Sequence, residues 1–413
     1  GAQVQLETTL QGLFGDRSAI SFAGNLAGSS GTGSGNFGWQ NNGDQTVKID
    51  ATTTYDPDGP LGPLPAVYAP AVNISDPDFY TGFMTEFVND ATHGEGGTDD
   101  GLDLEGGDLA DFSTTTNIAP DTIAQEESST QRVNEDFLEQ WIEHWRDAGN
   151  QPPDQTISTN TTWTGGGPNQ LTFLTASQLK SGNIITGSGT LIIRGNLTMS
   201  GGAKLNWDGD VIVVPSSSGS GQGKLIVNDA EINVTGGLVL APDPADNKTV
   251  GLYTNHEDAA VNVTGTLLAI QAGTGAAEIS IQKGGELKVD GLLGMLGDNI
   301  AVEVNGAPGS APGDPGRSKL SVSGSTVIAV PPGGSGLQKL RFDAASDTVF
   351  QFDNAKFEAG VQLAEEGSQH STVEPPPYQV NRTGYREVSP TTILAQFDAL
   401  RLDPSDGAGV SAP

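Results

Sequence analysis

The sequence contains no cysteine, few basic side chains and no long apolar run. Its 413 residues include 0 Cys, 4 His and 19 Lys plus Arg. The lack of Cys excludes disulfides, zinc–thiolate sites and thiol nucleophiles. A run of about 18 apolar residues, which a membrane-spanning helix needs, does not occur. The chemistry of any site must therefore come from carboxylates, amides, hydroxyls, aromatic rings and a few imidazoles.

Positive charge is scarce, and it is unevenly distributed. The 51 Asp and Glu give a formal net charge of −32, and between Lys48 and Arg132 the sequence has 17 acidic residues and no basic one. Such a surface repels nucleic acid and anionic membranes, so we expect neither as a partner. Two explanations of the acidity remain open: a proteome adapted to high salt, and a surface that holds Ca²⁺ or other cations.

Short apolar runs and 57 Gly dominate what is present. One pattern recurs, in which an alternating apolar run, a Gly corner and a second apolar run follow one another. Its copies lie at 191–199, 232–240, 261–270, 287–295 and 320–328. The later copies start 29 (261 − 232), 26 (287 − 261) and 33 (320 − 287) residues apart. This interval is typical of stacked β-solenoids, and we predict a mainly β fold with a right-handed parallel β-solenoid.

The rest of the chain divides around the repeat. The predicted parts are an acidic, irregular β-rich region at 1–130, an amphipathic helix at 131–150, a linker with a leading strand at 151–180, the solenoid at 181–365 and a Pro-rich tail at 366–413. In the first region we predict strands at Val4–Leu10, Ala19–Phe22 and Thr46–Thr54, and a short helix at Asp78–Asn89.

The strongest helix pattern runs from Glu135 to Ala148, with Asn134 as N-cap and Gly149 as stop. Its wide apolar stripe consists of Phe137, Leu138, Trp141, Ile142 and Trp145. A stripe with two Trp predicts docking. We expect the helix to cap the open end of the solenoid, where terminal strands would otherwise pair with another chain. Docking onto a neighbouring subunit through Phe137, Trp141 and Trp145 is the alternative.

Carboxylates are concentrated in a Gly-rich stretch at 95–111. The candidate ligands there are Asp99, Asp100, Asp103, Glu105 and Asp108. Oxygen ligands on a flexible loop suit Ca²⁺, the one cofactor that the sequence indicates. The spacing matches neither the twelve-residue EF-hand loop nor a Gly-Gly-x-Gly-x-Asp repeat. A solvated acidic loop is the alternative.

No catalytic arrangement is evident, and we expect a protein that is not an enzyme. The four His residues, His93, His144, His256 and His370, show neither triad nor metal-ligand spacing. Polysaccharide-cleaving β-helices use carboxylates on one outer face, sometimes with Arg or Lys. The residues that could take this role are Asp208, Asp210, Asp229 and Arg194. Aspartates at corners are more often turn formers.

Glycan binding is the third possibility. The aromatic residues in polar or Gly-rich contexts are Trp39, Trp163, Trp207 and Tyr253. Trp207 alternates with core residues and is equally explained as an inward packing residue. Asn-X-Ser/Thr sequons, which weakly indicate an exported glycoprotein, occur at Asn73, Asn160, Asn196, Asn233, Asn247, Asn262 and Asn381.

The block at 187–202, GSGTLIIRGNLTMSGG, is followed by WDGDVIVV at 207–214 and by GLVLA at 237–241. It resembles the repeat domain of PilX-like type IV pilus accessory proteins over about residues 180–300. The run GYREV at 384–388 is similar to the aromatic-Arg-Glu ending common in that group. The apolar pilin helix of the family is missing, either because it was removed before Gly1 or because only the rod is shared. The resemblance implies a part in pilus or filament architecture, with adhesion as the outcome.

These features together predict a secreted or surface-displayed structural protein, a subunit or accessory component of a pilus or surface filament. The opening residues carry no charged-then-apolar leader, so we expect a mature chain. The expected partners are further copies or other pilus subunits, and the strand carrying Val4, Leu6 and Leu10 is predicted to add to a neighbour's sheet. The alternative is a β-helix protein that binds or cleaves carbohydrate, with surface glycans as partners.

Overall fold

The structure is a computed structural model that forms two units, one of residues 1–12 with 378–413 and one of residues 13–377. The residues it describes are 3–11, 20–23, 25–27, 36–41, 46–50, 67–68, 102–105, 123–124, 135–158, 161–215, 223–241, 249–307, 310, 314–329, 338–342, 345–366, 369–374 and 379–388. The helix predicted at Asp78–Asn89 and the N-cap predicted at Asn134 lie outside them.

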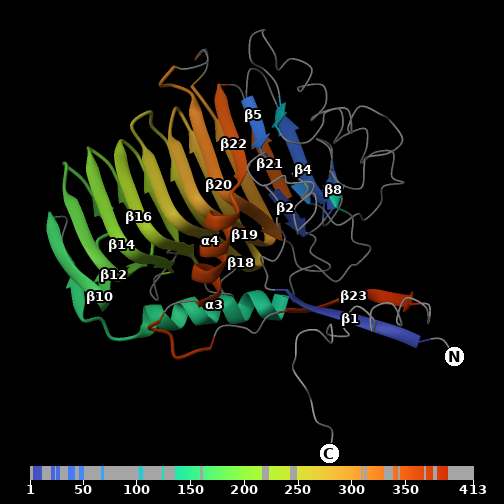
Figure 1. Cartoon of the computed structure of the whole chain (residues 1–413). Helices are drawn as coiled ribbons and strands as arrows, with labels where there is room; N and C mark the ends of the chain where they lie inside the picture. The colour runs from blue at the N-terminus through green and yellow to red at the C-terminus, as the bar shows by residue number, and fades with distance from the viewer. Residues whose placement is uncertain are drawn as a thin grey trace, which may run out of the picture. The chain divides into compact units, whose positions relative to one another are not determined.

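The larger unit is a stack of parallel rungs, which confirms the predicted β-solenoid (Figure 1). The strands after residue 150 are β9 (Gln155–Ile157), β10 (Trp163–Leu174), β11 (Gln178–Leu179), β12 (Ile184–Arg194), β13 (Leu197–Met199), β14 (Ala203–Val214), β15 (Lys224–Val227), β16 (Ala230–Leu240), β17 (Val250–Thr254), β18 (Ala260–Gln282), β19 (Glu286–Asn305), β20 (Ser318–Ala329), β21 (Gln338–Phe342) and β22 (Ser346–Phe352).

Three parallel sheets run along this stack. Each long strand passes through a corner Gly, with its first half in sheet 1 and its second half in sheet 2. Sheet 3 contains the short strands β11, β13, β15 and β17 and the last parts of β18 and β19, followed by β21. The apolar half of the alternating pattern in sheet 1 points inward. Ile232, Val261 and Leu287, for example, stack in register and are buried.

Backbone geometry explains the Gly at each corner between sheets 1 and 2. Gly236, Gly265 and Gly291 are stacked in register and have φ of 145°, 135° and 152°. L side chains rarely adopt such conformations. A Cβ on Gly265 would also lie 2.3 Å from the carbonyl oxygen of Gly236 in the rung before it. The Gly in the repeat therefore marks a corner where stacked backbones leave no room for a side chain.

The N-terminal strands continue the same stack, so the region predicted as a separate part at 1–130 contributes rungs to the solenoid. These strands are β2 (Ile20–Ala23), β3 (Asn25–Ala27), β4 (Asn36–Asn41), β5 (Thr46–Asp50), β6 (Val67–Tyr68), β7 (Leu102–Glu105) and β8 (Ile123–Ala124). β2 pairs with β20, β4 with β21 and β5 with β22. At the other end, β9 stacks on the second half of β10, and β10 with β11 forms the first full rung, where a linker with a leading strand was predicted.

Helix α3 (Glu135–Asn150) confirms the predicted helix, but it lies across the rungs rather than over an end of the stack. It contacts β14, β18 and β19, and Figure 1 shows it running below the successive strands. Gly149 lies inside the helix and not at its stop. A Cβ there would meet Val214 and Ile192 at 3.2 and 3.6 Å, so Gly149 lets the helix approach sheet 2 closely.

A second helix, α4 (Asn354–Glu366), lies where solenoid was predicted. The Asp353 carboxylate accepts hydrogen bonds from the amides of Ala355 and Lys356 at 3.1 and 3.2 Å, as an N-cap does. The helix contacts β16, β18, β19 and β20. Gly360 rests against Leu292, and its carbonyl accepts a hydrogen bond from Thr266 at 2.6 Å. Both helices thus pack on the outer side of sheet 2.

The smaller unit is an antiparallel ribbon of β1 (Gln3–Gln11) and β23 (Gln379–Val388). β1 confirms the strand predicted at Val4–Leu10, and β23 falls in the predicted tail. Leu6 pairs with Tyr385 and Leu10 with Val380, with an irregularity between Leu6 and Thr8. Among the described residues, none of the helices combines the length and the apolar composition that a membrane span requires.

Candidate functional site

The outer side of sheet 2 is closed by the chain's own helices. The second halves of its strands are buried residue after residue, as at Leu191, Ile192 and Ile193, where an ordinary exposed sheet alternates. Trp141 and Trp145 of α3 are 2% and 1% exposed against this sheet. The alternative in which these Trp side chains dock onto another subunit is therefore wrong, because this chain already covers them. The side chain of Phe137 is outside the described part.

The outer side of sheet 1 carries exposed and half-buried polar side chains in a regular pattern. We call it the ladder face. Its members are Lys204, Asn206, Asp208, Glu231, Asn233, Thr235, Asn262, Thr264, Glu286, Lys288, Asp290, Lys319, Ser321 and Ser323. They alternate with the inward core residues and are exposed or half-buried. In-register pairing places them in columns that repeat about every 4.8 Å along the stack.

The central column is a ladder of side-chain amides. Asn233 Nδ2 donates to Asn206 Oδ1 at 2.8 Å, and Asn262 Nδ2 donates to Asn233 Oδ1 at 2.9 Å. Asn233 Nδ2 also reaches Glu231 at 2.8 Å. Each amide thereby orients the next, so the column presents a fixed pattern of donors and acceptors. The repeat carried the signal for it, because each Asn stands three residues before a corner Gly.

Ion pairs flank the ladder. Lys204 Nζ lies 2.6 Å from Glu231, and this hydrogen bond, with that from Asn233, lowers the pKa of Glu231. Asp290 lies 2.8 Å from Lys288 Nζ and 3.1 Å from Lys356 Nζ of α4. Burial raises the pKa of Asp290, but the bonds from both lysines outweigh it and lower the pKa overall. The ladder face thus carries paired, fixed charges of both signs.

Three of the aromatic glycan candidates, Trp163, Trp207 and Tyr253, are engaged in contacts within the chain. Trp207 is 2% exposed, donates through Nε1 to the Gly189 carbonyl and stacks on the half-buried Trp163 ring with 6.1 Å between centroids. Tyr253 has Lys224 over its ring at 5.0 Å. The ring also lies so close to Gly251 that a Cβ there would be 2.5 Å from a ring carbon.

Trp39 lies on β4, in register with Leu340 of β21. Its side chain is outside the described part of the chain.

The residues considered for a lyase-like site serve different local roles. Arg194 donates to the Gly149 carbonyl at the end of α3 and lies 4.3 Å over the Phe173 ring. Asp210 accepts the amide hydrogen of Gly237 at 2.9 Å, so it links two neighbouring rungs rather than closing a turn on its own backbone. Asp208 stands on the ladder face, while Arg194 pairs with Val214 at the far end of sheet 2.

The acidic stretch proposed for Ca²⁺ is only partly a loop. Asp103 and Glu105 belong to β7, where Asp103 pairs with Lys48 and Glu105 with Asp50. Asp99, Asp100 and Asp108 are outside the described residues. A ligand set on a wholly flexible loop is therefore wrong for Asp103 and Glu105, because strand pairing fixes their backbone.

The ladder face can hydrogen-bond an extended partner at several consecutive rungs, because its donors and acceptors repeat in register. Its amides, hydroxyls and paired ions suit a polar polymer better than an apolar ligand. No family model, curated protein or solved structure matches this chain, so what it binds or builds has to be argued from these surfaces.

Proposed function

We propose that this chain is a non-enzymatic, extracellular structural protein, a subunit or accessory component of a pilus or surface filament. The solenoid supplies a stiff body, since its rungs are paired in register from β9 to β7. The resemblance of residues 180–300 to PilX-like proteins supports the same reading. Assembly follows through the ribbon of β1 and β23, and adhesion through exposed polar surfaces.

The ribbon is the observation that carries the proposal. It is a unit separate from the solenoid, and its described residues form two strands. An isolated two-stranded sheet is marginally stable in water, and three or more strands or a packed face are needed. Each described strand of the ribbon is paired along one edge. A strand from a second copy or another subunit would complete it, which is β-strand addition.

Proline substitution at neighbouring positions of β1 tests this assembly. The N–H groups of successive residues in a strand point to opposite edges, and proline removes one of them. Gln5→Pro and Leu6→Pro therefore divide the two edges between them, so that one variant loses a bond to β23 and the other loses the free edge. We expect both variants to assemble less than the wild type in light scattering and electron microscopy, because strand addition needs an intact ribbon and a free edge.

Gln5→Thr and Leu6→Thr are matched controls, since threonine suits a strand and keeps its N–H. They should assemble normally, and circular dichroism should show an intact solenoid in all four variants. A wild-type chain that stays monomeric at high concentration, or assembly unchanged in both proline variants, would refute the proposal.

Carbohydrate binding is the second candidate, and the ladder face favours it. Its columns of amides and hydroxyls could hydrogen-bond a polysaccharide laid along the stack. A glycan array followed by titration with Asn233→Ala and Thr235→Ala tests this idea. Ser280→Ala, in sheet 3, is the control. If binding weakens in the ladder-face variants and not in Ser280→Ala, a glycan-binding role would replace the filament role.

A further inference from the structure

Two turns on neighbouring rungs bring a histidine and two carboxylates together at the corner between sheets 3 and 1. Asp229 lies in the turn between β15 and β16, and His256 and Asp258 lie in the turn between β17 and β18. The turns are stacked because β15 pairs with β17 and β16 with β18. One ligand atom from each of the three side chains lies within 4.8 Å of the others. We call this group the corner cluster.

The backbone around the corner cluster is fixed by the stack. The amide of Asn255 donates to the Val227 carbonyl of the preceding rung at 3.1 Å, and the Asp229 carbonyl accepts from Gly202 at 2.7 Å. The amide of Ala259 closes the second turn on the His256 carbonyl at 3.0 Å. The three exposed side chains therefore project from anchored turns, and small side-chain rotations suffice to bring their donor atoms closer.

No Lys or Arg side chain of the described residues forms an ion pair with this cluster. Elsewhere on the rungs Glu231, Asp290 and Asp347 each have a Lys or Arg partner within 3.1 Å. In the described part of the chain Asp229 forms no ion pair with Lys or Arg. Asp258 has only the His256 imidazole, at 3.5 Å. An external cation between the two turns would offset this negative charge.

The donor set indicates the class of cation. Ca²⁺ takes six to eight oxygen ligands, whereas imidazole nitrogen suits Zn²⁺ and its first-row neighbours. Ligand atoms around a tetrahedral Zn²⁺ with bonds of about 2.1 Å lie roughly 3.4 Å apart, which the corner cluster reaches with modest rotation. His256 Nδ1 accepts the Asp258 amide hydrogen at 3.2 Å, which engages the lone pair of that nitrogen. A metal ion would therefore bind Nε2, or replace this hydrogen bond at Nδ1.

We propose that Asp229, His256 and Asp258 form a surface site for a divalent first-row transition metal ion such as Zn²⁺. The site is distinct from the acidic stretch at 95–111 and independent of the ribbon. Water would complete the coordination, because all three side chains are exposed. The sequence holds the signal in the repeat interval itself, since His256 follows Asp229 by 27 residues (256 − 229), one rung of the solenoid.

Calorimetric titration with ZnCl₂ tests the site, with millimolar CaCl₂ present throughout to occupy carboxylates that bind cations without selectivity. The variants are His256→Ala and Asp229→Asn. Asp208→Asn is the matched control, because it removes an exposed Asp of the solenoid outside the corner cluster. Co²⁺ absorption in the visible range reports nitrogen and oxygen ligation in the same samples, and thermal melts confirm that the variants are folded.

We expect one Zn²⁺ equivalent per chain that persists in Ca²⁺. It should be lost in His256→Ala, weakened about tenfold or more in Asp229→Asn and unchanged in Asp208→Asn. Zn²⁺ heat that Ca²⁺ abolishes, or equal affinity in wild type and His256→Ala, would overturn the site. Either result would leave the filament proposal standing, because the ribbon contains none of these residues.

Discussion

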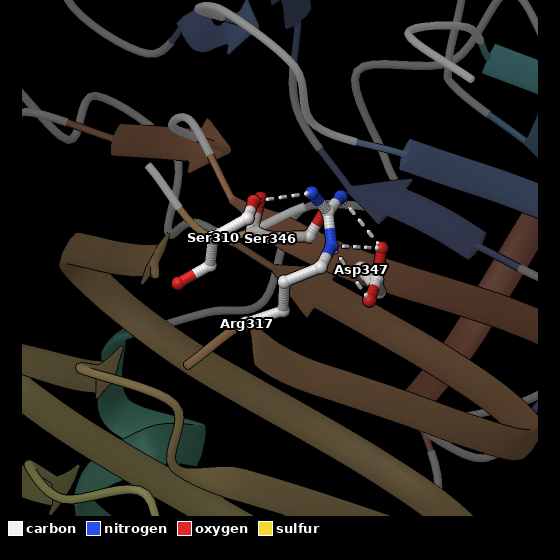
Figure 2. Close-up of polar contacts among 4 residues, drawn as sticks. All are labelled: Ser310, Arg317, Ser346 and Asp347. Carbon is white, nitrogen blue, oxygen red and sulfur yellow. Dashed lines mark hydrogen bonds and ion pairs between the residues drawn. The ribbon is translucent and has the colours of Figure 1, made fainter. Parts of the chain in front are cut away.

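Arg317 is completely buried, and its guanidinium grips the carboxylate of Asp347 on the neighbouring rung (Figure 2). Arg317 Nε donates to both carboxylate oxygens at 3.0 Å and Nη2 donates to Oδ1 at 2.8 Å. The same guanidinium reaches the carbonyls of Ser346 and Ser310 at 2.9 and 3.4 Å. Arg317 thereby links β20 and β22 and holds Ser310, in the loop before β20, against the stack.

The first prediction follows from the bidentate geometry of this pair. Arg317→Lys should destabilise the chain by about 2 kcal/mol, because a lysine cannot match two carboxylate oxygens and two carbonyls at once. Arg317→Met should cost about 3 kcal/mol, because it also leaves the Asp347 carboxylate and the buried carbonyls without a hydrogen-bond donor. Urea unfolding measures both. Arg341→Lys, at a half-buried pair with Glu303 3.4 Å away, is the control and should change stability much less, because both side chains still reach solvent. Equal effects at Arg317 and Arg341 would contradict the prediction.

The second prediction concerns the stacked corner glycines. Gly265→Ala should destabilise the solenoid by about 3 kcal/mol, from an unfavourable φ and from overlap with the Gly236 carbonyl. Gly202 offers a matched control, since it has φ of 73° and a Cβ added to it would have no atom within 4 Å. Gly202→Ala should cost only about 1 kcal/mol, from the φ alone. A similar loss of stability in both variants would show that the close approach of the stacked backbones is not what requires Gly at position 265.

The third prediction is a loss of stability in mild acid, where residues 371–373 contact α3 through His144 and Asp147. His144 is 2% exposed between the Trp141 and Trp145 rings, and its Nδ1 lies 2.5 Å from the Val373 carbonyl. Burial lowers the pKa of His144 more than the Val373 hydrogen bond and the charge of Asp147 raise it. The unfolded chain therefore takes up the proton first, so stability present above about pH 6.5 is lost as the pH falls below it.

Asp147 adds a second step at lower pH. Burial raises the pKa of Asp147, but hydrogen bonds from Thr372, Gln151 and Ser371 outweigh it and lower the pKa overall. Its contribution is thus present above about pH 4 and disappears as the pH falls through the native value. Urea unfolding at neutral pH, mildly acidic pH and below pH 4 separates the steps. His144→Gln should flatten only the upper step, and a curve of unchanged shape would disprove the role of His144.

The sequence predicted the local features well because they depend on local rules. The alternation around Val261, the corner Gly265 and the stripe of Trp141 and Trp145 follow from strand and helix periods. It did not reveal that β2 stacks on β20, where Ile20 pairs with Thr326. Neither segment contains a local pattern that identifies the other as its pairing partner, so the N-terminal region was predicted to be a separate part.

The same limit explains the misplaced helix and the missed site. An apolar stripe tells that α3 is covered, but not whether an end or a face of the stack covers it. Sheet 2 could have supplied the answer, because its strands are apolar at consecutive positions, as at Leu191, Ile192 and Ile193, which indicates burial on both sides. The corner cluster was missed because His256 and Asp229 meet only when the turns are stacked.

The last prediction concerns two sequons that coincide with the amide ladder. Asn233 and Asn262 are each followed by Val-Thr, but both lie within paired strands, and the Nδ2 of each already donates to a neighbouring Asn. Attachment of a glycan would break these bonds and place a bulky group on a regular sheet. We therefore expect no glycan at either position when the folded chain meets a glycosylating enzyme, whereas the unfolded chain should be modified. Mass spectrometry of peptides after deglycosylation in ¹⁸O water measures the occupancy. Asn233→Gln should lower stability by about 1 kcal/mol, because the longer side chain cannot keep both ladder bonds in register. Efficient modification of folded protein at Asn233 would mean that the ladder opens in solution.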